Sequence, residues 1–562
     1  MTSQGDSGKR RRFSRKTSIG IIAVGFLGLL YWGAMVVADR QLTRMLPDAL
    51  AEAVGGRDAA RYTVTVEGVK LSYSLRGVTV RNLRVSLDST AAAKTTEPAL
   101  IRAANLGLLR VSGLRLIPLL LGKGIFVSSI EIDGPVISLD FAAAGGNAGE
   151  SAQPEDAEPM AQSNSPRPPN ATLRSVSIRN GSIDLKRPTD YGALTSFLRN
   201  LELKLTEIQI DTVTLANPVS ALTNSRVSLA FDTVYHVLDD SLYTVTATGF
   251  RAESRDSVME IGTIQFTPTL EATPFFGRLR QRADRLGLSA GPIRIEGLDF
   301  AKYISDEALA IRLIEVDSLD LNVHSDIDLD WGPKARPCRY HMGFSEIPVP
   351  FRIDTVRVND GFIRYSELAK GSVSPGELTF EEVAGLITNL TNDPDLMTPA
   401  TPAVVHMTAR LFGEGDMEAT VRYPLLSPTL DFDVEASAGP MSLTTANRFA
   451  SNVAGVEVTK GDLDSLWVGL ESRDGKATGR VHMRYRDLSF RMYDRNTGKE
   501  KVWHSVLGFA GRVATRGSNP GKPEDEPRDG KIDYTCGEDH IVFFEFFVGS
   551  LVNGVKRIVL IL

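Results

Sequence analysis

The sequence contains one match to the pattern of a nucleophilic serine, G-x-S-x-G, at Gly287-Leu-Ser289-Ala-Gly291. In a nucleophile elbow a strand leads into the serine and a helix follows it. Here a charged stretch with helical character comes first, and Pro292–Ile295 has the pattern of a strand. The order is inverted, so the motif does not predict a catalytic serine.

Two other motifs have spacings that suit metal ions. Asp326-Ile-Asp328-Leu-Asp330 is similar to the start of a calcium loop, but position six is Trp331 and position twelve is Pro337. Apolar residues alternate with the aspartates, which predicts a strand with one acidic face. Cys338-x-x-His341 has no second ligand pair nearby. We therefore predict a protein that is not an enzyme, with no catalytic residues, no metal and no cofactor.

Composition narrows the function classes further. The chain has 562 residues, of which 42% are hydrophobic and 23% charged, with a net charge of −6. Basic residues concentrate in the first 18 positions, so the rest of the chain is acidic and nucleic acid is an unlikely ligand class by charge. Two cysteines exclude a disulfide scaffold, and leave open one disulfide or two free thiols.

The N-terminal region predicts a membrane anchor. Residues 19–38 contain no charge and are long enough, at ~1.5 Å per residue, to cross a bilayer core as a helix. The basic tail of residues 1–18 precedes them, which places the N-terminus in the cytoplasm and the body across the membrane. A cleavage site near Val36 and Ala38 is the alternative. The residues predicted to face lipid are Ile19, Ile22, Phe26, Leu29, Trp32 and Val36.

Apolar and polar residues alternate along most of the remaining chain, as in Leu201–Leu205 and Leu319–Val323. This period of two is typical of strands that are wetted on one face. We therefore predict a mainly β fold: a transmembrane helix, then a long, twisted antiparallel sheet with few short helices and an amphipathic C-terminal helix.

A loose unit recurs within these strands, at Ile130–Ile137, Val176–Ile183 and Val356–Ile363. In each unit an apolar-polar alternation meets an Asx-Gly pair and then resumes. The pair marks either a hairpin turn or a bulge that bends the strand. The units are either true repeats or unrelated hairpins that share turn residues.

A few segments depart from the strand pattern. A juxtamembrane helix is expected within residues 39–60, mainly over Leu42–Val54, and a second helix over Pro274–Leu286. Residues 142–170 are rich in Ala, Gly, Ser and Pro, which predicts a disordered loop. Residues 517–531 are similar in composition and predict a flexible linker.

The last segment, Ile541–Leu562, is predicted to be a hydrophobic helix after a terminal strand that begins near residue 532. Its polar residues fall on one narrow stripe that includes Glu545. Three roles stay open: capping the β body, docking on a membrane or a membrane partner, or spanning a bilayer. The apolar positions on which the helix depends are Phe543, Phe546, Phe547, Leu551 and Val555.

One stretch carries a family resemblance. Phe351–Asn392 joins FRIDTVRVNDGFIRYSEL, a strand-turn-strand pattern, to ELTFEEVAGLITNLTND. Tyr423–Phe432 and Gly479–Leu488 follow in a similar order. Together with the anchor and the terminal helix, these segments resemble the AsmA-like family of bacterial envelope proteins, of which TamB and YhdP are larger members.

The resemblance divides the body into an N-terminal β-groove segment at 61–141, a middle segment at 171–344 and a C-terminal AsmA-like module at 345–516. It implies an open apolar β-groove in a protein of the inner membrane and periplasm, which conducts phospholipids to the outer membrane. The resemblance and the strand pattern together predict these groove-facing residues: Ile130, Ile132, Ile137, Val176, Ile178, Ile183, Val356, Val358 and Ile363.

The expected partners are membrane phospholipids, the inner membrane through the anchor, and the outer membrane or a protein in it through the C-terminal helix. Two other functions stay open. One is a non-enzymatic assembly factor or scaffold for outer-membrane proteins, which would bind clients along strand edges. The other is an enzyme that acts on envelope glycans.

Overall fold

The residues that the computed structural model describes are 39, 40, 43, 62–72, 74, 76–87, 101–114, 127–140, 173–189, 192–208, 225–238, 241–279, 282–300, 302–303, 308–330, 344, 347–493, 514–537 and 543–561. The fold is mainly β, as predicted, with one large mixed sheet of 22 strands and few helices. Its contacts divide the chain into two units. Unit 1 is residues 1–189 with 202–216, and unit 2 is residues 190–201 with 217–562.

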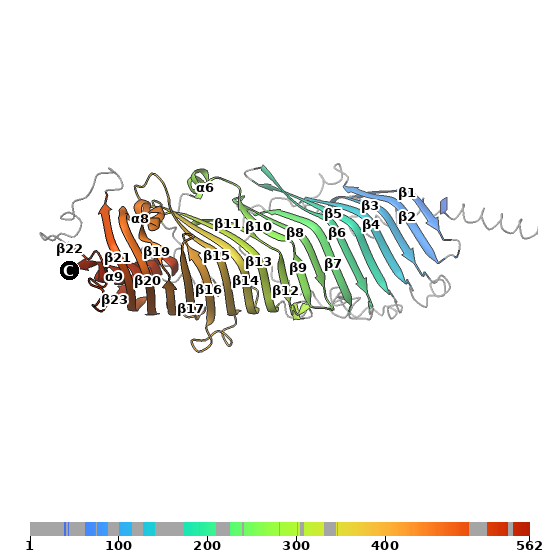
Figure 1. Ribbon diagram of the computed structural model, residues 1–562. Coiled ribbons are helices and arrows are strands. Elements are labelled where there is room, and N and C mark those ends of the chain that lie inside the picture. The colour runs from blue at the N-terminus through green and yellow to red at the C-terminus, as the bar shows by residue number, and fades with distance from the viewer. Residues whose placement is uncertain are drawn as a thin grey trace, which may run out of the picture. The chain divides into compact units, whose positions relative to one another are not determined.

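Unit 1 holds five complete strands, each joined to the next in chain order (Figure 1). They are β1 (Tyr62–Leu71), β2 (Gly77–Leu87), β3 (Ile101–Ser112), β4 (Ser129–Asp140) and β5 (Ser175–Thr189). Strand β6 (Gly192–Thr206) contributes residues to both units.

Unit 2 holds the remaining strands and the helices. Its first strands are β7 (Arg226–Val237), β8 (Tyr243–Glu253), β9 (Val258–Ile261), β10 (Thr263–Pro268), β11 (Asp284–Ala290), β12 (Ile293–Glu296), β13 (Leu309–Asp326), β14 (Phe351–Leu368) and β15 (Gly376–Thr391). Its later strands are β16 (Ala403–Leu411), β17 (Gly415–Tyr423), β18 (Phe432–Ala438), β19 (Met441–Ser442), β20 (Val456–Arg473), β21 (Lys476–Met492), β22 (Ala514–Thr515), β23 (Asp529–Thr535) and β24 (Leu560–Ile561). Its helices are α6 (Ala272–Leu279), η3 (Leu443–Ala446), α8 (Asn447–Ala454) and α9 (Phe543–Val559).

The sheet is mixed, which corrects the prediction of a purely antiparallel one. Strand β4 pairs with β5 in parallel, and β13 pairs with β14 in parallel. Parallel neighbours need a long connection that returns the chain to the end where it started. Residues 141–174 and 327–350 supply the two connections. The alternating pattern reports a strand's faces and carries no information about its direction.

Each strand of unit 1 contains a shift in its apolar alternation. One apolar cluster includes both Val66 and Val69, both Val80 and Leu83, and both Leu106 and Leu109. Residues three apart lie on opposite faces of a regular strand, so an irregularity must turn the chain between them. Asn82, between Val80 and Leu83, has a left-handed φ of 49°. This one-residue shift keeps the apolar side chains on a single face.

Unit 2 repeats the same device. Its cluster includes Ala247 with Phe250, Ile261 with Ile264, Ala290 with Ile293, and Val316 with Leu319. Gly249 has a φ of 64° between the first two, and Gly291 a φ of 145° between Ala290 and Ile293. The shift is therefore a general property of these strands.

On the opposite face, the irregular positions carry a recurring pair, an asparagine that donates to a carboxylate on a neighbouring strand. In unit 1, Asn82 donates to Glu67, and Asn180 Nδ2 donates to Asp133 Oδ1 at 2.8 Å. In unit 2, Asn200 pairs with Asp232 at 2.9 Å and Asn359 with Asp317 at 3.0 Å. These bonds hold adjacent strands together at the point where each strand bends.

The recurring Asx-Gly unit is therefore a bend within a strand and not a hairpin turn. Ile130–Ile137 lies within β4, Val176–Ile183 within β5 and Val356–Ile363 within β14. Gly134 and Asn180 are left-handed, whereas beside β14 the left-handed residue is Glu382 of β15. The strand-turn-strand reading of Phe351–Leu368 is corrected in the same way, because this segment is one continuous strand.

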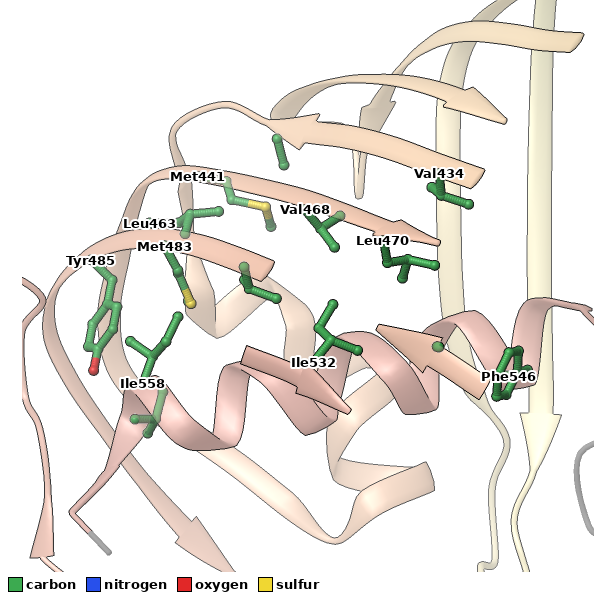
Figure 2. Packing of buried hydrophobic residues seen from close by; sticks show 14 of the residues in the cluster. Val434, Met441, Leu463, Val468, Leu470, Met483, Tyr485, Ile532, Phe546 and Ile558 are labelled. Carbon is green, nitrogen blue, oxygen red and sulfur yellow. The ribbon is translucent and has the colours of Figure 1, made fainter. Parts of the chain in front are cut away.

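The C-terminal strands form a closed core with α9. Figure 2 shows side chains of β18, β20 and β21, among them Val434, Val468 and Tyr485, pointing toward this helix. Phe546 and Ile558 of α9 are fully buried, as is Ile532 of β23. Phe543, Phe547, Leu551 and Val555 pack on the same cluster half-buried. Of the three roles left open for the terminal helix, capping the β body is the one observed.

Two predicted local structures are corrected. The helix predicted over Pro274–Leu286 is α6, which ends at Leu279, and Asp284–Ala290 instead joins the sheet beside β13. In the predicted linker 517–531, Asn519 is buried and its Nδ2 donates to the carbonyls of Met483 and Arg528 at 2.6 and 2.9 Å. Strand β23 already begins at Asp529. Residues 142–170, and most of 39–60, lie outside the described residues.

The bend geometry makes a prediction at Gly134. Its φ is +62° and a Cβ there would have open space, so Gly134→Ala tests backbone strain alone. We expect this variant to lower the free energy of unfolding by about 1–2 kcal/mol, and Gly134→Asn by less, because asparagine tolerates the left-handed region. Urea unfolding of the full chain measures the difference.

Gly68→Ala is the matched control. It lies in the same unit, with equally open space around its Cβ but an ordinary φ. We expect it to be neutral, or stabilising by up to about 1 kcal/mol through the unfolded chain. Equal losses of stability in the two alanine variants would contradict the role assigned to the bend.

Candidate functional site

The predicted groove residues of unit 1 lie side by side in rows. In the parallel pair of β4 and β5, Ile130 is opposite Val176, Ile132 opposite Ile178, and Ile137 opposite Ile183. The rows continue onto β3 through Val111, Leu109 and Ala104. All six predicted residues are half-buried. Unit 1 thus has an apolar face whose side chains contact one another and remain partly accessible.

The predicted residues of unit 2 form a matching arrangement. Val356, Val358 and Ile363 of β14 are in register with Ile314, Val316 and Leu321 of β13. All three are half-buried, and Val358 packs on the cluster around Ile293 and Val316.

Aromatic side chains extend this apolar surface among the earlier strands of unit 2. Phe231 of β7 stacks on Phe250 of β8 with ring centroids 4.4 Å apart. Tyr243 stacks on Phe266 at 4.3 Å. Phe250 belongs to the same cluster as Val316, so these strands share an apolar face.

Burial distinguishes these faces from the C-terminal core. Val481 and Ile532, which lie beneath α9, are 0% exposed. None of the nine predicted groove residues is buried to that extent. This difference indicates that a second layer covers the C-terminal face but not the face that carries the nine residues.

The faces opposite the apolar rows are polar and carry ion pairs. In unit 1, Arg110 pairs with Glu131 at 3.0 Å and Arg102 with Asp140 at 3.1 Å. In unit 2, Arg357 pairs with Glu315 at 3.2 Å. Exposed pairs of this kind add little stability, but they keep the outer face hydrated.

A buried polar group lies where the first turn of α9 meets β11 and β14. Arg282 pairs with Glu545, and their side chains are only 9% and 14% exposed. Beside them, the Tyr365 hydroxyl donates to Glu367 at 2.8 Å. Burial raises the pKa of Glu545 to about 7 against the opposing effect of Arg282, and burial also raises the pKa of Asp284. The arrangement anchors α9 through charges that water reaches poorly.

The sequence motifs do not assemble into an active site in the described part of the chain. Ser289 lies within β11, opposite Gln265 and Asp320 of its neighbours, and so is not at a strand-helix turn. Strand β13 ends at Asp326, whose carboxylate accepts a bond from the Asp328 amide at 3.0 Å. This Asx turn corrects the acidic strand predicted through Asp330. Within the described ranges, no three His, Cys, Asp or Glu side chains are grouped to hold a metal ion.

Several predicted features lie outside the described residues: Cys338, His341 and all of the anchor, including Ile19, Ile22, Phe26, Leu29, Trp32 and Val36. No described helix has the length and apolarity needed to cross a membrane. Cys536, which follows β23, is disulfide-bonded.

Comparison with known proteins found no match. No protein-family model, no curated protein and no solved structure is similar to this chain at a significant level.

Sequence reasoning missed two features of the site. The alternation shift leaves a signal, because apolar residues recur at i and i+3 around a Gly or Asx in each strand, as at Val80 and Leu83. The Arg282–Glu545 pair leaves no comparable signal, since 263 positions separate its members. Only the packing of α9 brings them together.

Glu545 predicts how stability changes with pH. Its folded pKa of about 7 is above the ordinary value of 4.5, so between these two values the folded chain holds a proton that the unfolded chain has released. The free energy of unfolding should therefore fall as pH rises from about 4.5 to 7, by on the order of 2–3 kcal/mol for this group.

Glu545→Gln removes this titration and can still accept a bond from Arg282. We expect its thermal midpoint to change less with pH over that interval than that of the native chain. Identical pH profiles would contradict the shifted pKa of Glu545.

Proposed function

We propose that this protein binds phospholipid acyl chains along the apolar faces of its sheet, and that it conducts them between the inner and outer membranes as a periplasmic protein anchored in the inner membrane. The observation that carries the proposal is the side-by-side, half-buried arrangement of the nine groove residues, from Ile130 to Ile363.

The physical chemistry of acyl chains fits such a face. Each methylene group that leaves water contributes about 0.8 kcal/mol, without any directional contact. Rows of Ile and Val provide a continuous apolar surface, whereas a protein client bound along a strand edge would need free backbone groups. In unit 1, β4 has both edges paired, to β3 and to β5. Binding at Ile132 and Ile178 therefore has to occur through side chains.

The proposed location is consistent with two further properties. The basic residues 1–18 and the uncharged residues 19–38 predict an anchor with the body outside the cytoplasm. The disulfide at Cys536 is typical of an oxidising compartment such as the periplasm.

A charge on the apolar face should remove bound lipid without unfolding the sheet. Ile178→Asp and Val358→Asp each place a carboxylate among half-buried apolar neighbours, where desolvation costs a few kcal/mol. We expect each variant to reduce phospholipid bound to its own unit by about tenfold or more, and the double variant to lose nearly all of it. Native mass spectrometry of the purified full chain, followed by lipid extraction, measures the bound phospholipid.

Ser177→Asp and Thr355→Asp are the matched controls. Each lies next to a test position on the same strand, so its side chain points to the opposite face. Lipid bound around the predicted anchor is common to all variants and cancels in the comparison. If folded Ile178→Asp and Val358→Asp proteins retain as much phospholipid as the controls, the proposal fails and the assembly-factor function becomes the better one.

A further inference from the structure

An indole ring lies flat on the outer face of the C-terminal strands. In β20, Leu466, Val468 and Leu470 point into the core with α9, so Trp467 points away from it. The ring extends over Gly469, where a Cβ would lie 2.4 Å from Cη2 of the indole. Glycine at this position lets the ring rest on the backbone, and the Trp467 residue remains 39% exposed.

The neighbours of Trp467 on this face are polar. Ser437 of β18 lies opposite it on one side and His482 of β21 on the other. The two rings are 5.0 Å apart, and His482 Nδ1 is 2.5 Å from Asp529 Oδ1 of β23. The bond to Asp529 fixes the imidazole beside the indole and extends its flat surface across three strands.

Two shallow concavities flank this surface, with volumes of about 690 and 600 Å³. Trp467 and His482 line both of them. The first also has Glu418, Ser465 and Arg484 at its border, and the second has Glu435 and Arg480. An extended ligand that lies over the indole would therefore meet donors and acceptors at both of its ends.

The charges around the concavities nearly cancel. The lining includes five arginines and six carboxylates. Several of these pair with one another, as Arg473 does with Asp433 at 2.8 Å and Arg410 with Glu382 at 3.4 Å. A phosphate-rich ligand would need an excess of basic residues. An apolar ligand would need an apolar border, and this one is polar.

We propose that Trp467 and its two flanking concavities bind an uncharged oligosaccharide, with one sugar ring stacked on the indole. The C–H face of a sugar ring is apolar and matches the flat aromatic surface. Its hydroxyl groups both donate and accept hydrogen bonds, which suits a border of arginine, serine and glutamate side chains. This site is independent of the proposed lipid function, because it lies on the face of the sheet opposite the core of α9.

Isothermal titration calorimetry of the full chain tests the site with two probes, chitohexaose and cellohexaose. The detergent should be lauryldimethylamine oxide, because a maltoside or glucoside would present sugar to the site. We expect at least one probe to bind, and Trp467→Ala to weaken its binding by about tenfold or more. Gly469→Ala should also weaken it, because the new methyl group lifts the indole from the backbone while every polar neighbour is retained.

Val373→Ala is the control, since Val373 is 96% exposed and does not line either concavity. It should bind like the native chain. Arg480→Ala and Arg484→Ala test the two concavities separately and serve as alternatives if a variant at Trp467 or Gly469 does not fold, as judged by its thermal midpoint.

Three results would overturn the proposal. The first is that neither probe binds the native chain at millimolar concentration. The second is that folded Trp467→Ala binds as tightly as the native chain. The third is that a sulfated hexasaccharide binds while both neutral probes do not, which would assign the site to anions.

Discussion

A one-residue shift of alternation is the constraint on which the described sheet depends. A strand of regular pleat would move its apolar residues to the other face after any break in the pattern. Here left-handed residues such as Asn82 and Gly134 make the break, and the residues beyond it return to the same face. The asparagine-carboxylate bonds, such as Asn180 to Asp133, hold neighbouring strands together at the bend. Without the shift, each unit would present two half-apolar faces.

A single apolar face in each unit can be either covered or left open, and the two outcomes occur in different places. Beneath α9 the face is covered, and residues such as Val481 and Ile532 are fully buried. At Ile132 and Ile178, by contrast, the face remains half-open. The helix that makes the difference is anchored by the Arg282–Glu545 pair, whose burial costs free energy that the surrounding aromatic packing offsets. The position of this anchor therefore marks where the covered face begins.

Much of this arrangement can be predicted from the sequence, because alternation of apolar and polar residues is local. The β class follows from it, as do the rows of candidate residues, since Ile130 and Val176 occupy equivalent positions in their units. Strand direction does not, because residues 141–174 give no sign of which end of β4 the chain returns to. The Asx-Gly pairs were ambiguous for a related reason: Asn180 in a bend and an asparagine in a hairpin turn adopt the same left-handed φ. The contact between Arg282 and Glu545 requires the packed fold.

The alternation that separates the two faces also separates the two proposed chemistries. Along β20, Leu466 and Val468 belong to the apolar core, while Trp467 between them belongs to the polar outer face. Most of that outer face is polar and ion-paired, as a water-exposed sheet requires, so a flat and accessible indole there does not contribute to the core. Gly469 strengthens this argument, since a side chain at that position would raise the ring from the backbone. An aromatic ring that adds nothing to the core, and is seated on a glycine among hydrogen-bonding groups, is best explained by a ligand that stacks on it.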